Sequence, residues 1–142
     1  MGSVLSIKLE KVTKNDYVFL YELLKERDPI SSISHKKIPT YTDHVSFVRS
    51  HPYSHWYVIY NKNEKIGSIY LSKQDEVGIF IKNTLQGRGI GSQALKILMK
   101  KNPRKRYLSN IAPKNKKSQN FFINKGFKLI QFTYELSFEN TK

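Results

Sequence analysis

Alternating apolar and polar residues predict several strands in the first half of the chain. Leu5, Ile7 and Leu9 alternate with polar residues, as in a strand with one buried face. Three more strands are predicted at residues 55–60, 65–71 and 76–81, with short polar turns between them. These connections are too short for parallel crossovers, so the three strands should form an antiparallel meander.

Two helices are predicted between the first strand and the meander. The first should begin at Asn15 or Asp16, either of which can cap it, and should end before Pro29. The second should begin at Thr42 and stop at Pro52. Residues 28–41 between them have no clean periodicity and are expected to form a loop.

Strands and helices also alternate in the second half of the chain. Apolar residues at three- and four-residue spacing predict a helix after Gly91 and another at residues 116–124. Strands are expected at residues 107–111 and 127–138. A strand, a helix and a strand in this order form a right-handed crossover, so a locally parallel pair is expected. The element order β-α-α-β-β-β-α-β-α-β is that of an α/β protein with a mixed sheet.

Length and composition narrow the class of protein. A chain of 142 residues fits one domain spanning 1–142. No run of about 18 apolar residues is present, so no membrane span is expected. No export leader is apparent and there is no cysteine, so we expect a cytoplasmic protein without thiolate chemistry. The net charge is +14. Nine basic residues and no acid stand between positions 96 and 117, which suits either nucleic acid or a phosphorylated small molecule such as coenzyme A.

A glycine-rich loop precedes the helix that follows Gly91. Gly87, Gly89 and Gly91 alternate with other residues, and Arg88 stands between the first two. Free amide groups at a helix N-terminus bind phosphate, although a plain helix start with turn glycines has the same pattern. A nucleotide P-loop is excluded because Ser92 and Gln93 occupy the places of its Gly-Lys pair, and a dinucleotide-binding turn is excluded because its third glycine is absent.

Three segments together carry a resemblance to a known family. The loop QGRGIG, residues 86–91, resembles the Q/R-x-x-G-x-G/A pyrophosphate loop of the GNAT family of N-acetyltransferases. Upstream, EVGIFIKNT is similar to the fourth strand of that family, and downstream NKKSQNFFINKGF is similar to its second conserved block. The resemblance covers about residues 64–127. It implies a GNAT-like acyl-CoA N-acyltransferase fold and an acetyl-CoA-dependent enzyme that uses no metal.

The resemblance also implies which residues bind acetyl-CoA. Backbone groups of the fourth strand would pair with the pantetheine, amides of the loop would bind the pyrophosphate, and residues of the second block would line the cofactor. The residues concerned are Ile79, Phe80 and Ile81; Gln86, Gly87, Arg88, Gly89, Ile90, Gly91 and Ser92; and Asn115, Ser118 and Phe122. Asn115 and Ser118 are equally suited to capping the helix that follows them.

The expected catalytic residue is Glu76, which heads the fourth strand where family members often place an acid that deprotonates the amine, with Asp75 as the alternative. The usual tyrosine acid of the family is Phe122 here, so water or another group must protonate the thiolate, or catalysis is weakened or absent. Tyr107 and Tyr134 are the candidate substitutes.

The acceptor pocket is expected under the loop between the first two helices. Its candidate residues are Ile30, Ile33, His35, Tyr41, Trp56 and Tyr70. The pair His51 and His55 has the spacing of a helical zinc site, but Pro52 prevents that helix and no metal site is expected.

The expected function is transfer of an acetyl group to a primary amine of a small molecule, such as an amino sugar or a nucleotide-linked amino sugar. The alternatives are a protein N-terminal or lysine acetyltransferase, a noncatalytic acyl-CoA-binding domain and, less favoured, a basic nucleic-acid-binding module. The sequence does not distinguish a monomer from a homodimer.

Members of the GNAT family usually end in two strands joined by a loop. Residues 127–138 contain no Gly or Pro that could turn the chain, so one long or bent strand is expected here.

Overall fold

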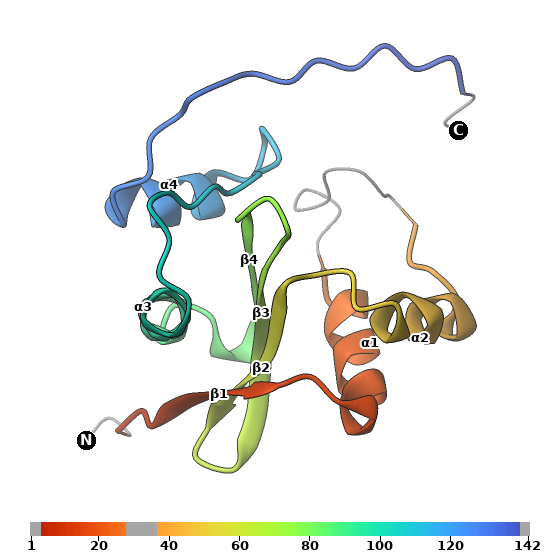
Figure 1. Ribbon diagram of the computed structural model, residues 1–142, viewed down its shortest axis with the longest axis vertical. Coiled ribbons are helices and arrows are strands. Elements are labelled where there is room, and N and C mark those ends of the chain that lie inside the picture. The colour runs from red at the N-terminus through yellow and green to blue at the C-terminus, as the bar shows by residue number, and fades with distance from the viewer. Residues whose placement is uncertain (1–3, 28–36, 140–142) are drawn as a thin grey trace.

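The computed structural model describes residues 4–27 and 37–139 and forms a mixed α/β fold (Figure 1). This confirms the predicted fold class. Its strands are β1 (Ile7–Lys11), β2 (His55–Asn61), β3 (Glu64–Leu71) and β4 (Val77–Ile81), and its helices are α1 (Tyr17–Lys25), α2 (Tyr41–Arg49), α3 (Ile90–Lys101) and α4 (Lys116–Asn124). Two short 3₁₀ turns, Lys14–Asp16 and Asn83–Leu85, precede α1 and follow β4.

The four strands form one antiparallel sheet in the order β1-β2-β3-β4. The predicted meander is therefore confirmed, with strand bounds that agree to within a residue. In Figure 1 the sheet is seen nearly edge-on, with α1 and α2 on one side and α3 on the other. Ile59, Ile69 and Leu71 of the sheet are fully buried and pack in one cluster with Leu95 and Leu98 of α3.

Helix α1 has Asp16 at its N-cap position, as predicted, but Asp16 does not cap it through its side chain, and α2 begins one residue before the predicted start. Thr13 accepts a hydrogen bond from the amide of Asn15 at 3.2 Å, and the carboxylate of Asp16 accepts one from the amide of Thr13 at 2.8 Å. Asp16 is buried and also forms an ion pair with Lys65 at 2.7 Å, so it is not free to cap α1 with its side chain. Helix α2 begins at Tyr41, one residue earlier than predicted, because the Thr40 hydroxyl caps it by accepting from the amide of Asp43.

The strand predicted at residues 107–111 forms only one isolated bridge. Leu108 pairs with Glu76 in parallel orientation, which confirms the expected parallel pairing at this position alone. Beyond it, Ser109 reaches the carbonyl of Val77 only through its side-chain hydroxyl, at 3.3 Å. The segment then separates from β4, and the remaining length of that strand is left without a neighbour on this side among the described residues.

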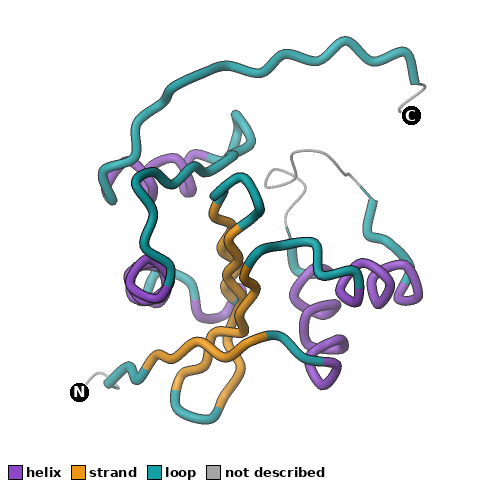
Figure 2. The backbone as a smooth tube through the Cα atoms, in the orientation of Figure 1, coloured by secondary structure: helices purple, strands orange, loops and turns teal. Residues whose placement is uncertain are grey.

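The strand predicted at residues 127–138 is wrong for the structure as described. The segment 128–139 is extended but pairs with none of the described strands, and it leads away from the rest of the chain (Figure 2). Its alternate apolar side chains are exposed; Phe132 is 73% and Phe138 is 91% accessible. The alternation is typical of a strand, but a strand forms only where another edge lies alongside it.

Among the described residues, no helix is both long enough and apolar enough to cross a membrane.

Candidate functional site

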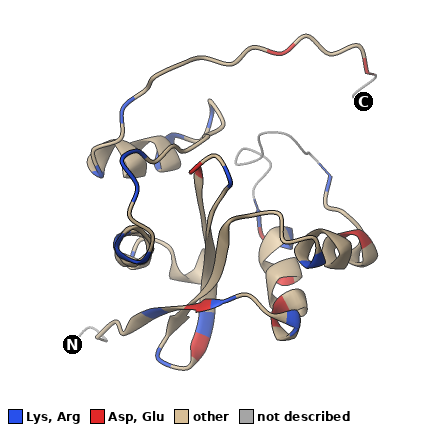
Figure 3. Ribbon diagram, viewed as in Figure 1, with Lys and Arg blue, Asp and Glu red and all other residues tan. Residues whose placement is uncertain are grey.

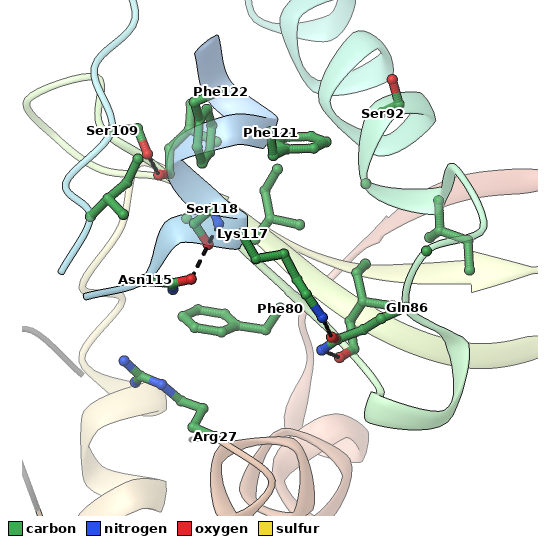
Figure 4. A pocket seen from close by; sticks show the side chains of 18 of the residues that line it. Arg27, Phe80, Gln86, Ser92, Ser109, Asn115, Lys117, Ser118, Phe121 and Phe122 are labelled. Carbon is green, nitrogen blue, oxygen red and sulfur yellow. Dashed lines mark hydrogen bonds between the residues drawn. The ribbon is translucent and has the colours of Figure 1, made fainter. Parts of the chain in front are cut away.

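A large cleft lies beside β4. Its volume is about 1470 Å³, and it is lined by β4, the glycine loop, the start of α3, residues 109–112 and α4. Figure 4 shows side chains from these elements facing one another across the cleft. The cleft therefore brings together segments that are separated in the sequence.

One wall of the cleft is the open edge of β4. The amide of Val77 donates to the carbonyl of Leu108 at 2.7 Å, and that pairing goes no further along the strand. On the β3 side, the carbonyl of Glu76 accepts from the amide of Ser72, and the amide of Lys82 donates to the carbonyl of Ile66. Alternate residues of an antiparallel strand face the same neighbour, so the backbone groups of Ile79 point to the open side. Those groups can pair with an extended ligand as a neighbouring strand would.

The glycine loop forms the floor of the cleft at the N-terminus of α3. Gly87 and Gly89 have positive φ angles of 79° and 81°, and a Cβ on either would have no atom within 4 Å. Within the described structure, the amides of residues 87–92 have no hydrogen-bond acceptor; the first donor after them is Gln93, to the carbonyl of Gly89 at 3.2 Å. Unpaired amides at a helix N-terminus are suited to binding an anion.

The side chain of Gln86 holds this loop in place. Its amide nitrogen donates to the carbonyl of Ile81 at 3.2 Å and to the Asn83 side chain at 3.3 Å. Its oxygen accepts from Nζ of Lys117 at 3.4 Å, which links the loop to α4 (Figure 4). Gln86 thus connects β4, the loop and α4, whereas Arg88 is exposed and does not line the cleft.

Helix α4 forms the opposite wall. The Asn115 side chain accepts from the amide of Ser118 at 3.2 Å, so the expected capping contact is present, and both residues also line the cleft. Phe122 lines the cleft at its inner end but is only 7% exposed, because it packs edge-on against Phe121 and Phe127. The tyrosine that the family usually places here is therefore replaced by a core residue.

The cleft carries positive charge. Lys114, Lys116, Lys117 and Lys125 line it, and Glu26 is the only acidic residue among its described lining. Figure 3 shows these basic segments along α4 and the loop before it. An anionic ligand is attracted by such a wall.

The acetyltransferase (GNAT) domain family matches residues 52–129, which is more than half of the chain. The chain belongs to the GNAT acetyltransferase family. It is accordingly an acetyl-CoA-dependent N-acetyltransferase, and the fold of this family binds acetyl-CoA. No curated protein sequence matches the chain.

Solved structures similar to this GNAT chain agree with it in fold. An acetyltransferase from Thermus thermophilus is 22% identical, with 90% of each chain covered and a TM-score of 0.73. The ribosomal L7/L12 alpha-N-protein acetyltransferase RimL, in complex with coenzyme A, is 18% identical, with 91% of this chain and 83% of that chain covered and a TM-score of 0.72. The microcin C7 self-immunity acetyltransferase MccE, in complex with acetyl-CoA and AMP, is 18% identical, with 85% and 78% covered and a TM-score of 0.64.

The two acids considered for the catalytic base differ in their surroundings. Glu76 accepts hydrogen bonds from the Ser72 hydroxyl at 3.0 Å and from the Asn110 side chain at 2.7 Å, and Asn110 in turn lines the cleft. Glu76 itself stands just behind that lining. Asp75 instead forms an ion pair with Arg104 at 2.9 Å outside the cleft, which makes it the poorer candidate.

The two tyrosines named as substitutes for the missing acid do not reach this GNAT cleft. The Tyr107 hydroxyl donates to the carbonyl of Asn102 at 2.6 Å and so serves the turn after α3. Tyr134 lies on the extended C-terminal segment and is 88% exposed. Neither residue lines the cleft: Tyr107 is bound at the end of α3, and the segment that carries Tyr134 is not paired with the sheet.

Aromatic residues cover the face of the sheet that carries α1. Tyr70 lines the cleft and stacks on Tyr53 with 3.9 Å between ring centroids, and burial raises the pKa of both hydroxyls. Trp56 packs against Tyr53 but lines a second hollow, near α2. Of the other acceptor candidates, Tyr41 packs edge-on against Tyr21 and does not line the cleft.

Ile30, Ile33 and His35 lie outside the described residues. Sequence reasoning missed Arg27, which lines the cleft after the end of α1, and Tyr53, which lines the second hollow but stacks on Tyr70 of the cleft. No local sequence pattern identifies Arg27 or Tyr53 as a site residue, because both reach Tyr70 only through the tertiary fold. The described residues contain no group of three or more His, Asp or Glu that could hold a metal ion.

Proposed function

We propose that this protein transfers the acetyl group of acetyl-CoA to a primary amine of a small molecule, such as an amino sugar or a nucleotide-linked amino sugar, as a single domain spanning 1–142. The observation that carries the proposal is the open edge of β4 next to the unpaired amides of residues 87–92. A strand-like pantetheine and an adjoining diphosphate need this pair of features, in this order, along one cleft.

The proposed roles follow from position. Backbone groups of Ile79 pair with the pantetheine. The backbone groups of Phe80 face β3 by the same alternation, and the carbonyl of Ile81 accepts from the Gln86 side chain, so these two residues are poorer partners than the sequence suggested. Amides of residues 87–92 bind the diphosphate, while Arg88, which lies outside the lining, contributes at most its charge to the surroundings of the cleft. Asn115, Ser118 and Phe122 line the cofactor on the side of α4. The reaction needs no metal, because the thioester is already activated toward an amine.

The reaction is a direct displacement. The amine nitrogen attacks the thioester carbon, a C–N bond forms, the C–S bond breaks and coenzyme A leaves as the thiolate. Glu76, acting through water beside Asn110, takes the proton that the amine loses. A thiol has an ordinary pKa of about 8.5, so water suffices to protonate the leaving thiolate in the absence of a tyrosine at position 122.

The alternative acceptor is a protein N-terminus or a lysine side chain. RimL acts on a ribosomal protein N-terminus by its name, and MccE was solved with AMP. We favour a small, nucleotide-like amine because the chain has a net charge of +14, and a basic surface attracts an anionic acceptor and repels a lysine-rich tail. A noncatalytic acyl-CoA-binding domain is the alternative that Phe122 supports.

The test has two stages. Acetyl-CoA should first raise the melting temperature. At a ligand concentration of one hundred times Kd, the free energy of unfolding should rise by about 2.7 kcal/mol. Release of free thiol is then measured with acetyl-CoA and a panel of amino sugars, nucleotide-linked amino sugars, polyamines, and peptides with a free N-terminus or lysine.

Thiol release with amino sugars supports the proposal, and release with peptides alone selects the protein acetyltransferase. Stabilisation by acetyl-CoA without release on any amine selects the noncatalytic domain. Salt-sensitive binding of nucleic acid without any effect of acetyl-CoA would contradict the proposal entirely.

A further inference from the structure

Arg27 enters the cleft from the face opposite the glycine loop. It follows α1, and its guanidinium carbon lies 4.7 Å from the centroid of the Phe80 ring, in a cation–π contact. Figure 4 shows its side chain extending beneath that ring, on the side of the helices α1 and α2. Arg27 therefore lies next to β4 but away from the amides at the start of α3.

The guanidinium of Arg27 has no hydrogen-bonding partner in the described structure. Its Nε atom is buried without an acceptor, and no ion pair of Arg27 with a described carboxylate is formed. Two described acids at or beside the cleft have other partners: Glu26 accepts from the amide of Asn83 at 2.8 Å, and Glu76 accepts from Ser72 and Asn110. A partly buried cation without an anion is costly unless a ligand supplies one.

The position of Phe80 assigns Arg27 to the acceptor side. Side chains of paired residues share a face of the sheet, so Phe80, Gly78 and Tyr70 lie on the α1 face. A Cβ on Gly78 would stand 2.2 Å from the Tyr70 ring, so the glycine is what lets Tyr70 lie over β4. On the other face, Ile79 packs against the core cluster that includes α3.

The diphosphate of the cofactor has its own donors, at residues 87–92 and the lysines of α4. Arg27 stands apart from both, in a wall built with Phe80 and Tyr70. That wall is apolar and aromatic apart from the guanidinium and the Tyr70 hydroxyl, which burial keeps protonated by raising its pKa. A planar guanidinium in such a place is suited to two parallel hydrogen bonds with a carboxylate or a phosphate.

We propose that Arg27 binds an anionic group of the acceptor, so that the substrate is a primary amine that also carries a carboxylate or a phosphate. This inference rests on the proposed function and makes its substrate class narrower. Phosphorylated and nucleotide-linked amino sugars and free amino acids belong to the class, whereas polyamines and uncharged amines do not.

The experiment measures binding of matched amines to protein saturated with coenzyme A, by calorimetry. The first pair is glucosamine 6-phosphate and glucosamine, and the second is L-serine and L-serinamide. In one of the pairs, wild-type protein should bind the member with the phosphate or carboxylate about 10 to 100 times more tightly than the member without it, which corresponds to one charge-assisted contact. The pair that shows the preference distinguishes phosphate from carboxylate.

Three variants complete the test. R27M keeps an alkyl chain against Phe80 but removes the charge, and it should bind both members of the pair equally while keeping its affinity for coenzyme A. R106M removes the same charge from an exposed site outside the cleft and should keep the preference. R27K should retain part of the preference, since its ammonium keeps the positive charge but cannot make the two parallel hydrogen bonds of a guanidinium.

Three results would overturn the inference. Equal binding of both members by wild-type protein, or an undiminished preference in R27M, shows that Arg27 does not bind the acceptor. Weaker binding of coenzyme A to R27M but not to R106M assigns Arg27 to the cofactor. Failure of wild-type protein to bind coenzyme A instead contradicts the proposed function itself.

Discussion

Replacing Gly89 with alanine tests whether the loop at residues 87–92 binds the cofactor. Gly89 has a φ of 81° at the N-cap of α3, and Gly126 has a φ of 95° just after α4; a Cβ on either would have no atom within 4 Å. Only Gly89 lines the cleft, so G126A is a matched control in which the backbone strain is similar and the site is untouched.

Both substitutions should destabilise the free protein by a similar amount. A left-handed backbone costs an alanine about 1–2 kcal/mol, and at this chain length each kcal/mol lowers the melting temperature by roughly 3–4 °C. The new Cβ of G89A also stands in the open space above the loop, where the diphosphate is proposed to lie. The loss of one charge-assisted hydrogen bond there, about 1.5–3 kcal/mol, weakens coenzyme A binding by about 10 to 150 times.

The assay combines thermal melting without ligand and calorimetric titration with coenzyme A. G89A and G126A should melt at similar temperatures below that of the wild type, while only G89A should lose affinity for coenzyme A. If G89A binds coenzyme A as tightly as G126A does, the amides of this loop do not hold the diphosphate. A drop in melting temperature for one variant only would show that the strain argument is wrong.

Three further predictions concern single residues. E76Q should slow thiol release by about 10² to 10⁴ times if Glu76 is the base, yet keep the melting shift with acetyl-CoA. N102A should lower the free energy of unfolding by about 1–3 kcal/mol in a urea titration, because the buried Asn102 side chain donates to the Tyr57 hydroxyl at 3.1 Å. Burial lowers the pKa of His44, so as the pH falls the unfolded state binds a proton before the folded state does. The melting temperature should therefore fall as the pH drops below about 6.5, the ordinary pKa of histidine. H44Q should make the melting temperature less dependent on pH in this range.

Local signals were sufficient for most of the fold. The alternation at residues 55–81 and the helical spacing after Gly91 are short-range patterns, and the sheet and α3 follow them closely. The capping side chains differ from those expected because several adjacent polar residues can cap, and α2 starts one residue early for this reason. Thr13 and Thr40 have the extended backbone that a cap needs, and the sequence does not reveal which candidate adopts it.

The candidate site was predictable only where its parts are continuous in the sequence. The loop at residues 86–92 and the head of α4 are contiguous motifs, so their positions in the cleft were expected. Arg27 and Tyr53 carry no such signal. They come to Tyr70 and Phe80 through the packing of α1 and of the turn before β2, and an arginine at a helix end is otherwise an ordinary surface residue.

Strand prediction failed where pairing, not propensity, decides the outcome. Residues 127–138 have the alternation of a strand, and residues 107–111 were expected to be one, but alternation specifies the faces of a strand and not its neighbour. The second segment pairs at Leu108 alone, and the first pairs with none of the described strands. The backbone groups of Ile79 are therefore left unpaired at the edge of β4, in the same cleft as the unpaired amides of the glycine loop. The end of strand pairing after Leu108 is thus what makes the edge of β4 available to a ligand, and a hydrophobic pattern does not encode where pairing ends.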